Sequence, residues 1–506
     1  MSERKWGTIL SYSHIIIANV ISLIYTPFML RMLGQSEYGL YGTANSFIAY
    51  LSMLNFGIGG AYIRFNARCR VNNNYEEEKQ LNGMFLTIFS LLSLLVLVVG
   101  LFFIAIAGYL VQNTYSSVEL YKLRVIMLIL ILNMVMTFIC TVIMMSLQAY
   151  EKFIVIRIVL LVMAVINPIF NIIALKMGGK AISITFISFL LSALSYLIFY
   201  LYAKHYINLQ FSFHGFKKDV VKELFVFSSF LFINSITDQI TFSTDNIILS
   251  AVKGTAATAV YTVGASFRIY FQNFSTSISS VFAPKINMIV ASTDNKTELN
   301  QLFQKVGRIQ FYIVSLILIG YTIVGQKFVE LWAGADYKDA YWIGLLLILS
   351  IFVPSIQNIG LEIQKALNKH KARSIVYFLI ACLNVLLTIP ACIIWGGIGA
   401  AAATTLCMFF GTVVFMNWYY WKKIKLDILS FWKSIFSIIP GFILPIIIGI
   451  FLINQYEITS LYGILIISLI ICTSYFISIW NFSMNKYEKD ICRSVLKKLS
   501  FKNYTR

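Results

Sequence analysis

The stretch FVFSSFLFINSITDQITFSTDNIILSAVKGTAATAVYTVGASFRIYFQNFSTSISSVFAPK (residues 225–285) contains two long apolar segments on either side of a short polar break. Each segment is long enough to cross a membrane as a helix, which takes about 20 predominantly apolar residues. The pair nevertheless carries Asp238, Asp245 and Arg268 at positions that should lie inside the membrane. Charges at that depth are costly and usually functional. This stretch therefore predicts a membrane fold and its candidate site together.

The composition of the whole chain agrees with a membrane fold. Of 506 residues, 59% are hydrophobic and only 12% are charged, whereas soluble domains have about 25% charged residues. The net charge of +19 is explained below by membrane topology, so we expect no nucleic-acid partner. The seven cysteines show no spacing typical of a metal site.

Charged and Gly/Pro/Asn-rich breaks divide the chain into fourteen apolar segments, each a predicted membrane-spanning helix. They lie near residues 8–33, 42–63, 82–108, 122–148, 153–176, 181–203, 222–250, 257–284, 303–326, 341–366, 372–395, 398–421, 434–454 and 460–482.

The distribution of Lys and Arg supports this count. With alternate connections assigned to opposite sides, one side holds 31 of the 40 Lys and Arg residues and the other holds 8, Arg268 being the remaining one. Cytoplasmic connections carry such an excess. We therefore expect both termini in the cytoplasm, and a cytoplasmic membrane of a bacterium as the location.

The chain also repeats itself at an offset close to 220 residues. Three blocks match in chain order. They are Gly34, Tyr41, Ser46 and Phe47 with Gly254, Tyr261, Ser266 and Phe267; Gln148 and Arg157 with Gln364 and Arg373; and Gly178, Gly179 and Lys204 with Gly396, Gly397 and Lys422. The offset spans six helices, an even number, so the halves have the same orientation and form a parallel repeat.

The predicted fold is thus an all-α polytopic membrane protein of two six-helix lobes with two extra C-terminal helices. The expected boundaries are a first lobe at 1–206, a cytoplasmic interfacial linker at 207–221, a second lobe at 222–424, and two helices with a basic tail at 425–506. The stretches 207–224 and 487–503 alternate apolar and basic residues, which favours contact with anionic membrane lipids. A solvated linker and tail is the alternative.

Polar residues form stripes along several predicted helices. Helical spacing places them on one face in three segments and near the cytoplasmic end of a fourth. They are Asn234, Asp238, Thr241 and Asp245; Arg268, Gln272, Ser275 and Ser279; Pro354, Asn358, Glu362 and Lys365; and Arg64. We expect these faces to line a cavity between the lobes, since a lipid-facing charge is unfavourable.

Structural explanations compete with this functional one. Asp238 and Arg268 lie at similar depth and would form an interhelical ion pair, while the serines would serve close helix contacts. Arg64 and Lys365 would anchor helix ends in headgroups. Asp245 has no basic partner at its depth in the sequence, which favours a titrating or cation-binding role.

The chain resembles the oligosaccharide-lipid flippases (Wzx-like polysaccharide exporters) of the multidrug/oligosaccharidyl-lipid/polysaccharide exporter superfamily. The resemblance rests on the fourteen helices, the six-helix duplication, LGQSEYGLYGTANSFIAYLSMLNFGIGGAYIRF (33–65) and GGIGAAAATTL (396–406). It implies two lobes around a cationic cavity and transport of undecaprenyl-diphosphate-linked oligosaccharides for surface polysaccharide synthesis, driven by an H⁺ or Na⁺ gradient. Glycosyltransferases and a polymerase are the implied partners.

On this resemblance, two groups of residues have expected roles. The substrate-binding residues are Arg268, Gln272, Asn273, Arg64, Asn358, Lys365 and Asn234, and the ion-coupling residues are Asp245, Asp238 and Glu362. No organic cofactor or resident metal is expected. No arginine lies between Arg4 and Arg31, which disfavours the peptidoglycan precursor as substrate.

Two other functions stay open: a cation-coupled multidrug or small-molecule antiporter of the same superfamily, and a non-transporting scaffold for glycan assembly. An enzyme is not expected, because no predicted loop exceeds roughly twenty residues and no nucleotide-binding motif is present.

Overall fold

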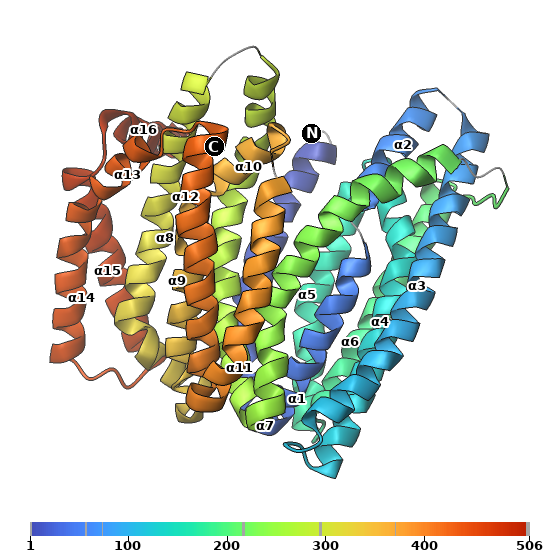
Figure 1. Ribbon diagram of the computed structural model, residues 1–506, viewed down its shortest axis with the longest axis horizontal. Helices are drawn as coiled ribbons and strands as arrows, with labels where there is room; N and C mark the ends of the chain where they lie inside the picture. The colour runs from blue at the N-terminus through green and yellow to red at the C-terminus, as the bar shows by residue number, and fades with distance from the viewer. Residues whose placement is uncertain are drawn as a thin grey trace. The chain divides into compact units, whose positions relative to one another are not determined.

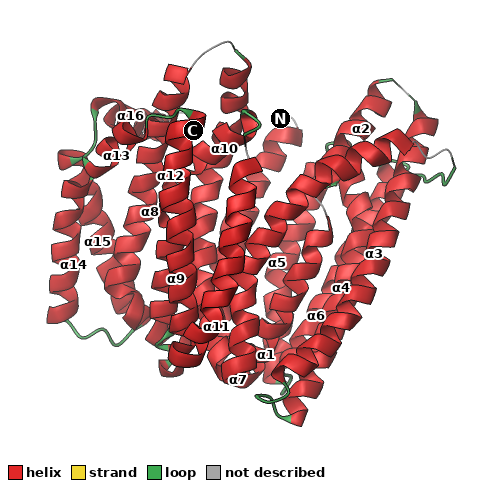
Figure 2. Cartoon of the chain, in the orientation of Figure 1, coloured by secondary structure: helices red, strands yellow, loops and turns green. Residues whose placement is uncertain are grey.

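A computed structural model describes residues 3–55, 58–72, 74–214, 218–292, 296–369 and 371–501. All regular structure in these residues is helical (Figures 1 and 2). The first half contains α1 (Glu3–Ser52), α2 (Gly59–Val71), α3 (Tyr75–Val111), α4 (Ser117–Ala149), α5 (Phe153–Lys176) and α6 (Ala181–Tyr206). The all-α prediction is confirmed.

The remaining helices follow a short extended segment after Tyr206. They are α7 (Lys218–Ala291), α8 (Lys296–Ala333), α9 (Ala340–Ile356), α10 (Asn358–Ala366), α11 (Lys371–Met408), α12 (Met416–Tyr419), α13 (Ile428–Phe436), α14 (Ile443–Gln455), α15 (Leu461–Phe482) and α16 (Lys486–Phe501). Two wide π-helical stretches, Phe409–Phe415 and Tyr420–Ile424, flank α12 and continue the line of α11.

Glycines break three of the longest helices. Gly34 in α1, Gly254 in α7 and Gly396 in α11 have φ of 77°, 80° and 60°. Positive φ is strained for any residue with a Cβ atom, so glycine is favoured at each break. Eleven helical stretches in the described residues are long and apolar enough to cross a membrane, and three of them contain these breaks. Counting both arms of each broken stretch gives the fourteen predicted segments.

The backbone repeats in the same way as the sequence. Gly34 and Gly254 share one conformation at the predicted offset of 220, and Gly178 and Gly396 both have positive φ at an offset of 218. Two further pairs of left-handed residues follow at an offset of 217: Glu151 with Asn368, and Asn208 with Lys425. The parallel repeat is confirmed. Its middle block is shifted by one residue from the predicted 216, because the left-handed turns, rather than the matching glutamines, set the register.

The chain forms two compact units. The first comprises residues 1–262 and 374–404, and the second comprises 263–373 and 405–506. These units group the helices differently from the predicted lobes, since α7 and α11 each contribute to both units. Compactness and repeat symmetry are different properties, so the lobe boundaries stay a prediction.

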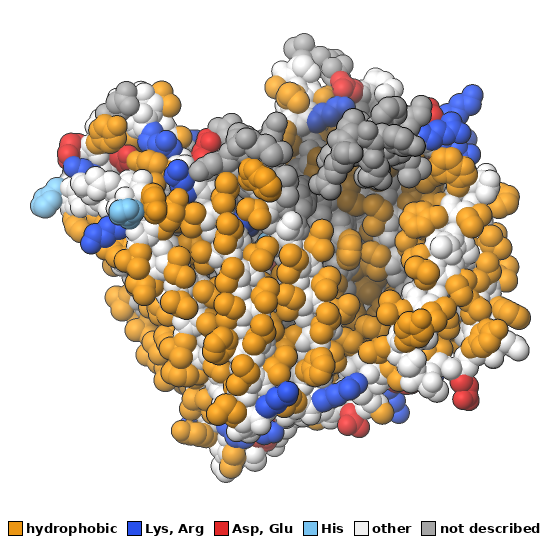
Figure 3. Space-filling model, turned by 180° about the vertical axis from the view of Figure 1, so that it is seen from behind, with side chains coloured by type: hydrophobic (Ala, Val, Ile, Leu, Met, Phe, Trp, Pro, Cys, Tyr) orange, Lys and Arg blue, Asp and Glu red, His pale blue; other side chains and the backbone are white. Residues whose placement is uncertain are grey.

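Within the first unit, α3 packs on α4, α1 on α5, and α4 on α6 (Figure 1). Aromatic side chains fill the interior, with Phe85, Phe89 and Phe138 almost fully buried. Many large apolar side chains point outward instead; Phe102 in α3, for example, is 62% exposed. Figure 3 shows that apolar side chains cover the helices along their length, while Lys and Arg gather near helix ends. This pattern suits helices surrounded by lipid.

Within the second unit, a buried ion pair holds the C-terminal helix. Arg308 of α8 donates from Nε to Glu488 of α16 over 2.5 Å, and both residues are less than 10% exposed. Arg308 also donates to the carbonyl of Ser483 and to the Tyr312 hydroxyl, each over 3.0 Å. The predicted amphipathic tail is therefore helical and is anchored at its first turn.

Candidate functional site

Asp245 lies on the first arm of α7 and is 1% exposed. Its carboxylate accepts hydrogen bonds from three hydroxyl groups. Tyr261 and Thr404 donate to Oδ2 over 2.5 and 2.7 Å, and Thr388 donates to Oδ1 over 3.3 Å. All four residues belong to the first compact unit. We call them, together with Asn384, the Asp245 cluster.

Asn384 completes this cluster. Its Oδ1 lies 3.3 Å from the Thr388 hydroxyl and 3.2 Å from the Thr404 hydroxyl, while its Nδ2 donates to the carbonyl of Thr241 over 3.3 Å. Asn384 and Thr388 precede the break at Gly396, and Thr404 follows it. The break in α11 therefore lets two arms of one helix present their side chains to the same carboxylate.

The cluster contains more close oxygen contacts than hydroxyl protons. Tyr261, Thr388 and Thr404 each supply one proton, yet they make five contacts shorter than 3.5 Å with the acceptors of Asp245 and Asn384. At any moment two of these contacts bring lone pairs together. A hard monovalent cation or an added proton would relieve this repulsion, because both prefer oxygen atoms around one negative charge.

Close backbone contacts position the first arm of α7. A Cβ atom at Gly39 of α1 would lie 1.9 Å from the carbonyl oxygen of Thr255, and one at Gly42 would lie 2.6 Å from the Thr262 hydroxyl. Polar contacts join the same helices, since Asn246 donates to Ser46 over 3.1 Å and the hydroxyls of Tyr50 and Thr244 are hydrogen-bonded. Asp245 is thus carried by a helix with little freedom to shift.

Arg268 lies on the second arm of α7, in the second compact unit, and is 8% exposed. It follows the break at Gly254 by fourteen residues, which corresponds to roughly 21 Å along a helix. Its Nη1 donates to Oε1 of Gln272 over 3.1 Å. The side chains of Gln272 and of the neighbouring Asn273 are exposed. The structure therefore brings together three of the predicted substrate-binding residues.

The predicted polar stripe of the tenth segment divides between two roles. Asn358 donates to the Ser275 hydroxyl over 2.6 Å, and Ser275 in turn donates to the carbonyl of Ser355 over 2.7 Å. These bonds join α7 to the junction of α9 and α10, as the structural explanation for the serines predicts. Farther along, Lys365 pairs with Glu362 over 2.9 Å in the same helix.

The other predicted residues lie apart from these groups. Arg64 is exposed and lies over the ring of Phe65, 5.1 Å from its centroid. Asp238 is exposed and belongs to the first unit, whereas Arg268 belongs to the second, so their pairing stays a prediction. The side chain of Asn234 lies outside the described residues.

Sequence reasoning selected Asp245 but missed the residues that surround it. Tyr261, Asn384, Thr388 and Thr404 carry no charge, and three of them belong to segments with no polar stripe. One indication was available: Asn384 is the only amide side chain between residues 374 and 395, and Thr388 follows it by one helical turn. Polar residues inside a membrane usually face the protein interior.

Comparisons with known proteins agree with this fold. A family model described as "Polysaccharide biosynthesis protein" matches residues 5–290. The lipid II flippase MurJ in an inward closed conformation has a TM-score of 0.70 and 16% identity, covering 93% of this chain and 97% of that one. An inward-facing multidrug resistance MATE family transporter of the MOP superfamily has a TM-score of 0.64 and 12% identity, covering 82% and 95%.

A MOP superfamily transporter from Pyrococcus furiosus is also similar, with a TM-score of 0.54, 13% identity, and coverage of 86% of this chain and 97% of that one. No curated protein matches the chain in sequence. At these identities, likeness to the solved structures establishes the fold and leaves the transported molecule open.

Proposed function

Because this chain belongs to the polysaccharide biosynthesis protein family, we propose that it moves lipid-linked oligosaccharides across a membrane. The substrate class is an oligosaccharide repeat unit on undecaprenyl diphosphate, and the direction is from the cytoplasmic to the outer leaflet. We further propose a bacterial cytoplasmic membrane with both termini in the cytoplasm, as the distribution of Lys and Arg indicates.

Buried Arg268 is the observation that carries this proposal. A guanidinium is always charged and presents a fixed fork of donors that matches phosphate oxygens. Its 8% exposure places it in a site of low dielectric, where such an interaction is strong. Gln272 and Asn273 next to it supply amide groups that bind sugar hydroxyls. The other proposed substrate contacts are Asn358, Lys365, Arg64 and Asn234.

The Asp245 cluster supports coupling to an ion gradient. One carboxylate surrounded by four neutral oxygen atoms suits H⁺ or Na⁺, and the hydroxyl contacts counted above favour an added positive charge. Ion release would leave the buried carboxylate uncompensated, which is costly in a membrane. The free-energy difference between the two states of this site is what a gradient would act on. Asp238 and Glu362 are the further proposed coupling residues.

Transport into vesicles tests the proposal. Proteoliposomes would be supplied with a fluorescent undecaprenyl-diphosphate oligosaccharide, and its accessibility in each leaflet would be measured for wild type, Arg268→Ala, Arg268→Lys and the control Lys253→Gln. A hydrogen bond to a charged group contributes about 1.5–3 kcal/mol, so Arg268→Ala should slow transport by at least about tenfold. Arg268→Lys should keep part of the rate, since it keeps the charge but loses the fork.

Two results would count against a flippase. Unchanged transport in Arg268→Ala at normal expression would remove the diphosphate role. Proton- or sodium-linked export of cationic drugs, without movement of the lipid-linked glycan, would instead favour an antiporter. If wild type moves neither, while glycosyltransferases and a polymerase still co-purify with it, the scaffold function is favoured.

A further inference from the structure

The second half of the chain contains a small basic pocket away from the sites described above. Its volume is about 200 Å³, and eight residues line it. They are Lys296, Leu299, Ile363, Leu367, Lys369, Ile424, Lys425 and Leu426. All of them belong to the second compact unit. We call this the lysine pocket.

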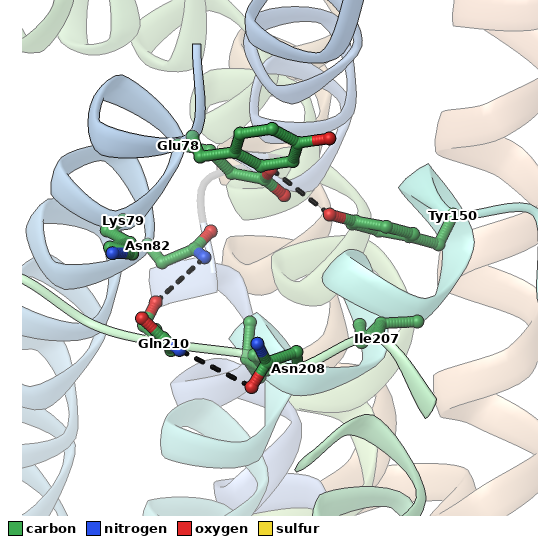
Figure 4. Close-up of a pocket in the computed structure, with 9 residues that line it drawn as sticks. Glu78, Lys79, Asn82, Tyr150, Ile207, Asn208 and Gln210 are labelled. Carbon is green, nitrogen blue, oxygen red and sulfur yellow. Dashed lines mark hydrogen bonds between the residues drawn. The ribbon is translucent and has the colours of Figure 1, made fainter. Parts of the chain in front are cut away.

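The first half contains a pocket at the corresponding place, lined by the starts of α3, the end of α4 and the segment after α6 (Figure 4). Backbone hydrogen bonds show the correspondence at an offset of 217. The amide of Leu209 donates to Ala203 and that of Leu426 to Tyr420; the amide of Tyr150 donates to Ser146 and that of Leu367 to Ile363. Duplication therefore produced two pockets from one backbone arrangement.

The first-half pocket is occupied by its own hydrogen bonds. Tyr150 donates to Glu78 over 3.1 Å, Asn82 donates to the carbonyl of Gln210 over 3.0 Å, and Gln210 donates to Asn208 over 3.4 Å (Figure 4). Burial and the contact with Glu78 raise the pKa of Tyr150 to about 12, so this hydroxyl stays a donor at physiological pH. The segment after α6 is thereby fixed against α3.

The lysine pocket has a different chemistry on the same framework. Leu299, Ile424 and Leu426 are each less than 10% exposed and form an apolar floor, whereas the three lysines are exposed. At the corresponding positions Lys425 replaces Asn208, and Leu299 replaces the acidic region around Glu78. Three positive charges and no carboxylate line the second pocket.

The nearest acidic side chain after the pocket is engaged elsewhere. Asp427 accepts from the backbone amide of Ser430 over 3.0 Å and caps α13, and these hydrogen bonds hold the pKa of Asp427 below its usual range. Lys369 donates to the carbonyl of Lys423 over 3.1 Å, which fixes its stem beside the pocket but leaves its positive charge unneutralised. The pocket therefore keeps a positive field.

The surroundings of the lysine pocket indicate a lipid environment. Trp421 is 51% exposed, as is typical of tryptophan at a membrane interface, and α13 exposes Leu429 by 76%. The pocket lies on the face that the Lys and Arg distribution predicts to be cytoplasmic, where the leaflet is anionic. Its volume is below the roughly 300–1,000 Å³ of pockets for drug-sized molecules, so a headgroup fits better than a whole organic ligand.

We propose that the lysine pocket binds the phosphate headgroup of an anionic phospholipid from the cytoplasmic leaflet. The three ammonium groups contact the phosphate, and the glycerol and upper acyl carbons lie on the apolar floor. This site is separate from Arg268 and the Asp245 cluster, so it adds a bound membrane lipid to the transported one.

Lipid titration of the purified full-length chain tests the site. Thermal unfolding in detergent would be followed against dioleoylphosphatidylglycerol, dioleoylphosphatidylcholine and inorganic phosphate. Each lysine near an anionic lipid is worth about a fivefold change in affinity. The triple variant Lys296→Gln, Lys369→Gln, Lys425→Asn should therefore bind phosphatidylglycerol on the order of 100-fold more weakly. The single variant Lys369→Gln should lose about fivefold and serves if the triple variant does not fold.

The matched control removes three charges from the same predicted face of the first half: Lys79→Gln, Lys152→Gln and Lys204→Gln. It should keep the wild-type affinity, as should Asp245→Asn, whose failure in transport would be a separate matter. Four outcomes would overturn the proposal: unchanged affinity in the lysine-pocket variants, an equal loss in the control, equal stabilisation by phosphatidylcholine, or equal stabilisation by phosphate alone.

Discussion

Replacing Asp245 by Asn is the sharpest test of the ion site, because it removes one charge and almost no volume. At about 4 Å and an effective dielectric constant near 20, a carboxylate attracts a monovalent cation by about 4 kcal/mol. If desolvation and hydroxyl rearrangement offset half of this, about 2 kcal/mol remains, which is roughly a 30-fold weaker affinity. The hydroxyls of Tyr261 and Thr404 can accept from the new amide, so the fold should persist.

The assay is ion-dependent stability of the purified protein. At an ion concentration 100 times its dissociation constant, binding stabilises the wild type by about 2.7 kcal/mol. With a 30-fold weaker site the same concentration gives about 0.9 kcal/mol, a third of the effect. Titrations with Na⁺ at fixed pH, and with pH at fixed Na⁺, identify the ion. The control is Glu78→Gln, which neutralises another buried carboxylate of the first unit. Full ion dependence in Asp245→Asn would refute the reasoning.

Three further predictions concern the fold. Gly254→Ala should cost about 1–3 kcal/mol because φ of 80° with ψ of −168° is strained for alanine, whereas Gly320→Ala, with nothing within 4 Å of its Cβ, should be neutral or stabilising; equal unfolding midpoints would contradict this. Gly83→Ala would place a Cβ 1.9 Å from the Ser212 carbonyl, so amide exchange should rise across residues 207–214, and unchanged exchange would show that the segment is not held there. Glu488→Gln leaves Arg308 buried without its partner, at about 3–5 kcal/mol, so trypsin should cleave faster within α16; Asp490→Asn, which loses only an exposed 3.6 Å pair, should cleave at the wild-type rate, and similar rates in both would rule out the anchor.

Hydrophobic length and the glycine breaks were sufficient to predict the helices. A membrane leaves few alternatives to helices, since every backbone polar group must be bonded within its own segment. The repeat was also visible, because Gly34 and Gly254 need a conformation that few other residues adopt. The wide turns on either side of α12 were not predicted, since a change in helical hydrogen-bond register leaves no mark in an apolar sequence.

The candidate site was predicted only where charge revealed it. Asp245 stood out because burying a carboxylate in a membrane requires compensation. Its partners Asn384, Thr388 and Thr404 are neutral, and they lie between 139 and 159 residues away in the chain. Their meeting depends on how α11 bends at Gly396 and packs on α7, which is a tertiary property. Helical spacing within one segment cannot report contacts between two segments.

The duplication explains why charge, rather than backbone, distinguishes the two halves. At an offset of 220, Tyr25 corresponds to Asp245 and Ile48 to Arg268, and at 217, Asn208 corresponds to Lys425. In each case the second half carries the charge while the turns around it keep the same handedness. A buried charge is tolerated only with specific partners, so a second copy in the first half would need its own set of hydroxyls or lysines. Retaining one charged and one neutral version of each place gives two similar halves with different affinities for ions and phosphates.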